Sequence, residues 1–192
     1  MDLLIQDYLK IFHEIASLFQ YNELESSLQK QVQNIQDLNA QLCSLRRVPA
    51  SNPLLNSKPL LKFALEKKIA YSLQEDFEKL NKLMKCLQPH IDKIRDFTSA
   101  AERAYEKANL DPSSVLGVAE SVPLNLANVM LLAHQGKQTV FQYHIALRES
   151  VLSLTANGDD LKIEGILETW TEMKNNHLLR KICAISHCLA AL

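Results

Sequence analysis

Residues 122–156 read VPLNLANVMLLAHQGKQTVFQYHIALRESVLSLTA, and this stretch decides the fold. It follows Ser121, a capping residue, has a proline in its first turn, and ends before Asn157-Gly158, which favours helix termination. One apolar stripe with steps of three or four contains Val129, Leu132, Gly136, Val140, Tyr143, Leu147, Val151 and Leu154. A second stripe contains Leu124, Ala127, Leu131, His134, Phe141, Ile145 and Leu152. Because the two stripes lie on nearly opposite sides of one helix, we predict a central helix with neighbours all round.

The composition of the whole chain favours helices. Its 192 residues are 47% hydrophobic, yet they include only 4 glycines and 6 prolines, too few for a sheet with many turns. Apolar residues recur at helical spacing along the chain, and no alternating strand-like segment of useful length occurs. We therefore predict an all-α fold, an elongated helical bundle of about five to six helices with long coiled-coil-like N-terminal helices.

Prolines divide this single predicted domain into three parts. Residues 1–47 form an N-terminal helical arm, residues 48–59 a proline-rich linker, and residues 60–192 a helical bundle. The heptad phase of the arm slips near Tyr21-Asn22, so the arm is either one long helix or two helices with a break there. Pro89 predicts a bend or a new start in the helix that follows the linker.

Charge and cysteine usage exclude several classes of protein. Lysine plus arginine (21) and aspartate plus glutamate (22) nearly cancel, and no long block has one sign, so we expect no direct nucleic-acid binding. No run of about 18 apolar residues occurs, so we expect no membrane span. The N-terminus lacks the pattern of a signal peptide, and the four cysteines are scattered, as in reduced intracellular proteins.

The sequence contains no local motif of catalysis or metal binding. The patterns of serine hydrolases, zinc proteases, phosphate-binding loops and calcium loops are all missing. Cys183 and His187 are four residues apart, but their spacing matches none of the usual zinc-ligand pairs. Gly136 lies on the first apolar stripe, and we expect that it permits a close crossing with another helix. We therefore predict a protein that is not an enzyme and has no cofactor, no catalytic residues and no bound metal.

The stretch from Val122 to Trp170 resembles the AIRIM family of helical ribosome maturation factors. The resemblance rests on the start VPLNLANVM (122–130), then Tyr143 and Leu147, and a Gly-Asp followed by Leu161, Leu167 and Trp170. Weaker similarity covers Val48-Pro49 and the segment Pro59-Leu60-Leu61-Lys62. The C-terminal tail is also similar to a related family, that of the cyclin-dependent-kinase-two-interacting protein, and both families remain open.

The resemblance implies a non-catalytic adaptor that works with AFG-two-type AAA+ ATPase subunits. It also implies a second small helical partner, similar to the cyclin-dependent-kinase-two-interacting protein, and indirect contact with the pre-60S particle. Such an assembly acts in cytoplasmic maturation of the large (60S) ribosomal subunit and is linked to replisome proteostasis, so we expect the protein in the cytoplasm and also in the nucleus. The candidate protein-binding residues are Tyr143, Leu147, Leu167 and Trp170, with core packing as the alternative for Trp170.

The residues also allow a function of another class. A structural coiled-coil subunit of a cytoskeletal, kinetochore or tethering complex would share the helical periodicity. Such a subunit would dimerise through residues 2–47 and would not bind AAA+ ATPases.

Overall fold

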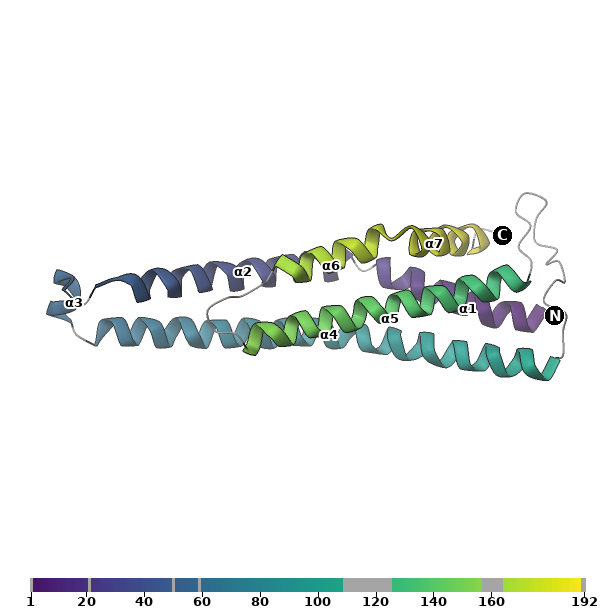
Figure 1. The fold of residues 1–192 in the computed structure, drawn as a ribbon, viewed down its shortest axis with the longest axis horizontal. Coiled ribbons are helices and arrows are strands. Elements are labelled where there is room, and N and C mark those ends of the chain that lie inside the picture. The colour runs from purple at the N-terminus through teal and green to yellow at the C-terminus, as the bar shows by residue number, and fades with distance from the viewer. Residues whose placement is uncertain are drawn as a thin grey trace. The chain divides into compact units, whose positions relative to one another are not determined.

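The computed structural model describes residues 2–20, 22–49, 51–58, 60–108, 126–156 and 164–190 (Figure 1). These residues form seven α-helices and no strand, so the all-α prediction is confirmed. The helices are α1 (Asp2–Gln20), α2 (Asn22–Arg47), α3 (Pro53–Ser57), α4 (Leu61–Ala108), α5 (Leu126–Ala156), α6 (Glu164–Asn175) and α7 (His177–Ala190). None of these described helices has the length and apolar character needed to cross a bilayer.

The helices form two compact units, which are described separately. The first unit comprises residues 1–22, 86–147 and 168–192, and the second comprises residues 23–85 and 148–167. Both α4 and α5 contribute residues to each unit. These boundaries differ from the predicted arm, linker and bundle, and that division of the chain stays a prediction.

The core of the first unit is built around α1. Five large side chains of α1 are completely or almost completely buried: Tyr8, Ile11, Phe12, Ile15 and Leu18. α1 packs against α7, and Gly136 of α5 lies where these two helices meet. A Cβ atom added to Gly136 would lie 3.0 Å from Cδ1 of Ile15 and even closer to Cδ1 of Ile182. The predicted close crossing at Gly136 is therefore confirmed.

α4 continues through Pro89 without a new start, so that part of the prediction is wrong. Proline removes one backbone hydrogen bond, and inside a helix it costs about 3 kcal/mol. Burial of neighbouring side chains, Leu87, Ile91 and Ile94, offsets this cost in the first unit. The spacing of apolar residues in the sequence does not show how tightly this turn of the helix packs against other helices.

The second unit is a helical hairpin formed by α2 and the first part of α4, together with the end of α5 and the start of α6. Its buried apolar residues in α2 and α4 are Leu24, Leu28, Val32, Ile35, Leu42, Leu73, Leu80 and Met84. The predicted linker holds one short helix, α3, which the sequence reading missed. Asn52 caps α3, since its Oδ1 accepts a hydrogen bond of 3.0 Å from the N–H of Leu54.

One helix boundary falls where the sequence placed it. α1 ends at Gln20 and α2 begins at Asn22, with Tyr21 outside the described residues, so the choice between one long helix and two stays a prediction. Asn176 separates α6 from α7, and its Oδ1 accepts hydrogen bonds from the N–H groups of Leu178 (3.1 Å) and Leu179 (3.2 Å). The predicted start of the central helix at residues 122–125, and its end at Asn157-Gly158, lie outside the described residues.

Candidate protein-interaction site

One side of α5 packs against other helices of this chain. The first apolar stripe is buried at Val129, Leu132, Gly136, Val140, Leu147 and Val151. Tyr143 is half-buried, and the side chain of Leu154 lies outside the described residues. This stripe therefore behaves as a core face, as its spacing predicted.

The other side of α5 is largely uncovered, which corrects the prediction of neighbours all round. In the first unit Leu131 is 54% exposed and Ile145 is 55% exposed. In the second unit Leu152, seven residues after Ile145 on the same helix, is also exposed. Part of the second apolar stripe is thus left exposed in each unit, while Ala127, His134 and Phe141 of the same stripe are half-buried.

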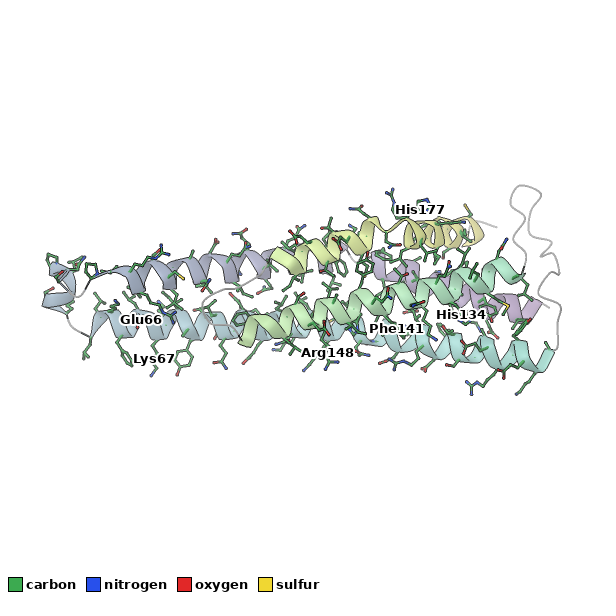
Figure 2. All side chains as sticks on the ribbon, viewed as in Figure 1. Glu66, Lys67, His134, Phe141, Arg148 and His177 are labelled. Atoms are coloured by element: carbon green, nitrogen blue, oxygen red, sulfur yellow. The ribbon has the colours of Figure 1, made fainter. Side chains whose placement is uncertain are left out.

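Two contacts with α4 border these exposed residues within the first unit, and their members on α5, His134 and Phe141, are labelled in Figure 2. Nδ1 of His134 lies 3.5 Å from Oε1 of Glu102. The guanidinium of Arg95 lies 5.5 Å from the centre of the Phe141 ring, a cation–π geometry. Leu131 and Ile145 thus form an apolar strip with charged groups along one margin. We call these two residues the α5 strip.

An exposed apolar strip beside charged groups is typical of a surface that binds another protein. Leu131 and Ile145 are two heptads apart, with the exposed Gln138 midway between them. This spacing matches the period at which one helix contacts another in a coiled coil. The α5 strip is therefore a candidate docking site for a partner helix.

The four predicted binding residues lie elsewhere. Leu147 and Trp170 are buried in the first unit, while Tyr143 in the first unit and Leu167 in the second are half-buried. Tyr143 and Leu147 lie one turn apart on α5, and Leu167 belongs to a different unit from the other three. Their role in binding stays a prediction. Sequence reasoning missed Leu131 and Ile145 as binding residues, although both appeared in the second stripe.

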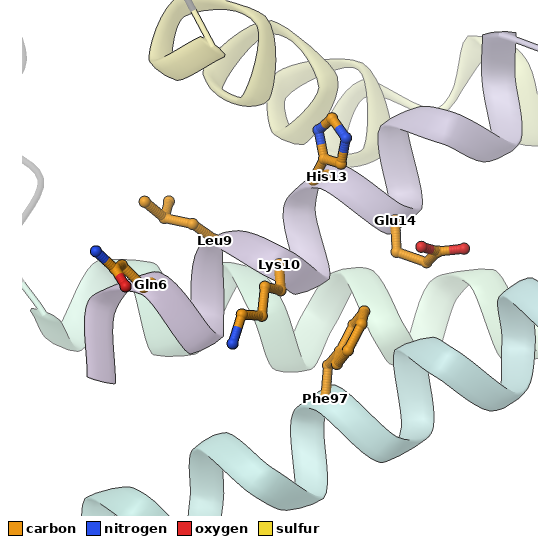
Figure 3. A pocket seen from close by; sticks show the side chains of 6 residues that line it. All are labelled: Gln6, Leu9, Lys10, His13, Glu14 and Phe97. Atoms are coloured by element: carbon orange, nitrogen blue, oxygen red, sulfur yellow. The ribbon is translucent and has the colours of Figure 1, made fainter. Parts of the chain in front are cut away.

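A shallow cleft of about 450 Å³ opens between α1 and α4 in the first unit (Figure 3). It is lined by Gln6, Leu9, Lys10, His13, Glu14 and Phe97. Two of its charged groups already have partners. Nζ of Lys10 lies 2.7 Å from Oδ1 of Asp7, and Oε1 of Glu14 lies 2.5 Å from Nδ1 of His90. The cleft therefore offers few uncommitted polar groups for chemistry.

The pair formed by Glu14 and His90 is the main buried polar feature of the first unit. Nζ of Lys93 lies 3.6 Å from the same carboxylate oxygen, and Oγ of Ser17 lies 3.4 Å from Nδ1 of His90. A buried carboxylate is costly unless it is paired. These contacts fix the relative position of α1 and α4 at the level of Pro89.

No metal site is assembled by the residues that the structure describes. Those residues include no group of three or more His, Cys, Asp or Glu side chains suited to hold a metal ion. Burial raises the pKa of the Cys183 thiol, which makes it a poorer nucleophile at neutral pH. Burial also raises the pKa of Tyr8 to about 12, with a smaller contribution from Glu102.

A family comparison decides between the two families suggested by the sequence. The model of the family described as ribosome biogenesis protein C1orf109-like (CA109-like) matches residues 2–185. The chain belongs to this family. This is the AIRIM family, so the resemblance found between Val122 and Trp170 is confirmed and extends over most of the chain. A comparison with curated proteins gave no match.

Family membership gives the function at a coarse level. The family is one of ribosome biogenesis proteins, and this chain shares that role in ribosome maturation. The match begins in α1 and ends within α7, so residues of both compact units lie within the matched range. The α5 strip therefore lies inside a domain whose function is ribosome biogenesis.

Proposed function

We propose that this protein is a non-catalytic adaptor subunit of an AFG-two-type AAA+ ATPase complex that matures the 60S ribosomal subunit in the cytoplasm. Its direct partners are the ATPase subunits and a second small helical subunit similar to the cyclin-dependent-kinase-two-interacting protein. The pre-60S particle is contacted indirectly, and the same complex also acts in replisome proteostasis in the nucleus. ATP hydrolysis takes place in the partner, and this chain connects the motor to its substrate.

The observation that carries the proposal is the α5 strip in a chain of the ribosome biogenesis family. Leu131 and Ile145 are each more than half exposed on a helix whose other side is buried at Val129, Leu132, Gly136, Val140, Leu147 and Val151. Covering such side chains removes apolar surface from water, which stabilises a complex by about 25 cal/mol per Å². A helix of the second small subunit, laid along α5, would bury both residues at once.

The burial of the apolar seam residues of α1 and α2 disfavours the alternative function as a structural coiled coil. Dimerisation through residues 2–47 needs an apolar seam that is open to a second chain. The seam residues Ile11, Ile15, Leu28 and Ile35 are all completely buried within this chain. A second copy would have to displace helices that already cover them.

Reconstitution with purified partners tests the proposal. The tagged full chain is mixed with the AFG-two-type ATPase subunits and the second small subunit, and the complexes are separated by size-exclusion chromatography. Wild-type protein is expected to enter a complex with both. The double variant Leu131→Asp and Ile145→Asp is expected to lose the small subunit, because two carboxylates would be buried unpaired in the interface.

The control is Gln135→Asp, which adds one negative charge at an exposed polar position of α5, where the double variant adds two. This control is expected to assemble like wild type, and circular dichroism should show all variants equally helical. If the double variant still binds the small subunit fully, the assignment of the α5 strip is wrong. If the wild-type chain binds neither partner, the adaptor function itself is wrong.

A further inference from the structure

The tip of the hairpin in the second unit is strongly basic, although the chain as a whole is nearly neutral. Residues 46–71, which we call the basic tip, contain six basic residues and one acidic residue. They are Arg46, Arg47, Lys58, Lys62, Lys67 and Lys68, with Glu66 as the single acid. The tip therefore has a formal charge of six minus one, or +5.

The basic tip is held together by a hydrogen-bonded turn. Nζ of Lys62 donates to the backbone oxygens of Arg46 (3.2 Å) and Val48 (3.0 Å), which join the start of α4 to the end of α2. Lys62 is thus used inside the tip, where its charge also complements the C-terminal end of α2. Because the ammonium group of Lys62 already donates to these two backbone oxygens, we expect a ligand to bind other cations of the tip.

The basic tip also exposes more large apolar side chains than any other part of the described chain. Leu54 is 72% exposed, Leu60 77%, Phe63 66% and Tyr71 60%, and Leu61 and Leu65 are exposed as well. Single exposed apolar residues are ordinary on protein surfaces, but a cluster of six is typical of a binding surface. Charge and apolar exposure therefore coincide at one end of one unit.

Three of these apolar residues, together with Lys67, form a stripe along one face of α4 and the turn before it. Leu60, Phe63, Lys67 and Tyr71 follow one another at steps of three and four. Nζ of Lys67 lies 5.8 Å from the centre of the Tyr71 ring. Figure 2 shows Lys67 on the side of α4 that faces away from α2, whereas Glu66 lies on the side toward α2. A cation is thus flanked by apolar groups on the open face.

We propose that the basic tip binds an acidic amphipathic helix of a partner protein. Carboxylates on that helix would pair with Lys67 and Lys68, while its leucine-type side chains would cover Leu60, Phe63 and Tyr71. The stripe from Leu60 to Tyr71 is about three helical turns long, which fits a short helical segment. This inference goes beyond the proposed function, because it concerns the second unit and does not depend on what covers the α5 strip.

The same observations disfavour the other occupants. A second copy of this chain would bring two tips of charge +5 together, and their repulsion opposes that contact. RNA would use the lysines and the two aromatic rings, but it would leave Leu60, which the partner helix would cover, without an apolar partner. A membrane would take up the leucines, but Lys67 stands in the middle of the apolar stripe, where an ion pair suits it better.

Binding of a synthetic probe tests the inference on the full chain. The probe is a fluorescein-labelled peptide of about four helical turns, with leucine on one face and glutamate on the other. Fluorescence polarisation should show saturable binding that weakens as salt is added, because salt screens exposed charges. The double variant Lys67→Glu and Lys68→Glu is expected to bind about tenfold more weakly or worse, and Phe63→Ala should weaken binding as well.

The matched control is the double variant Lys82→Glu and Lys85→Glu, which reverses two exposed lysines of α4 outside the tip. Equal loss in this control would mean that only net charge matters, and the inference would be overturned. It would also be overturned if an oligouridine or a phosphatidylserine vesicle bound more tightly than the peptide with the same dependence on Lys67 and Phe63.

Photocrosslinking in cells identifies the natural ligand. A benzoylphenylalanine placed at Phe63 is expected to crosslink to a protein segment rich in acidic and leucine-type residues, and the same probe at the exposed Gln41 of α2 is not. Crosslinks to RNA, to lipid or to a second copy of this chain would each overturn the proposal.

Discussion

Gly136 of α5 faces Ile182 of α7 so closely that any side chain at position 136 would meet Cδ1 of that isoleucine. Ile182 is itself completely buried, so its side chain has little room to move aside. We predict that Gly136→Ala lowers the free energy of unfolding by up to about 2 kcal/mol, since overpacking a core costs about 1–3 kcal/mol and the helix propensity of alanine offsets about 1 kcal/mol of that cost. Urea denaturation followed by circular dichroism measures the change.

Gly165→Ala is the matched control for Gly136→Ala. A Cβ atom at Gly165, in α6, would meet no other atom within 4 Å. Because alanine favours helix over glycine by about 1 kcal/mol, this control should raise the stability. If both variants raised it equally, the close approach of α5 and α7 would have no energetic consequence.

The hydroxyl of Tyr8 is buried and makes no hydrogen bond among the described residues. A buried hydroxyl without a partner costs about 1–3 kcal/mol. We therefore predict that Tyr8→Phe, which removes only this oxygen, leaves the stability at pH 7 unchanged or raises it by about 1 kcal/mol. Thermal and urea denaturation at pH 7 check the sign, and a clear loss of stability would contradict it.

The raised pKa of Tyr8 also predicts a dependence of stability on pH. The ordinary tyrosine pKa of 10.0 applies to the unfolded chain, and burial raises the pKa to about 12 in the folded protein. The unfolded state therefore loses its proton first, and the free energy of unfolding should fall as the pH rises from 10.0 toward 12. Tyr8→Phe should remove part of this fall, measured as the difference between the two proteins over that range.

Removal of either partner from the pair of Glu14 and His90 should cost more than removal of both. His90→Leu leaves the buried carboxylate of Glu14 with only the more distant Lys93, so we expect a loss of about 2 kcal/mol or more. The double variant Glu14→Leu and His90→Leu should be closer to wild type, because no buried charge remains. A double-mutant cycle gives the coupling energy, and strictly additive losses would contradict the prediction.

Helix type and one boundary could be predicted because they are local properties of the chain. Asn176 separates α6 and α7 through its own side chain, whose Oδ1 accepts hydrogen bonds from the N–H groups at the start of α7. Whether α4 continues through Pro89 is not decided by the local sequence. A proline in a helical pattern predicts a break, but here buried neighbours on both sides hold the helix continuous.

The candidate site could be predicted only in part, because burial depends on how many neighbours a helix finds. Leu131 and Leu147 look alike in the sequence, since both lie on apolar stripes of one helix. Only packing shows that Leu147 is buried while Leu131 is exposed. The basic tip was missed for another reason, because its charge disappears when it is averaged over a longer window of sequence.

The contrast between Leu147 and Leu131 gives the last prediction. Leu147→Ala removes a completely buried side chain and leaves a cavity, so the free energy of unfolding should fall by about 2–5 kcal/mol. Leu131→Ala, the same change on the same helix, removes a side chain that is mostly in water and should alter stability by less than about 0.5 kcal/mol. Binding of the second small subunit is expected to show the reverse order when both variants are measured under conditions where they remain folded. If Leu131→Ala proved as destabilising as Leu147→Ala, both faces of α5 would be core, and the surface proposed to bind the partner would not exist.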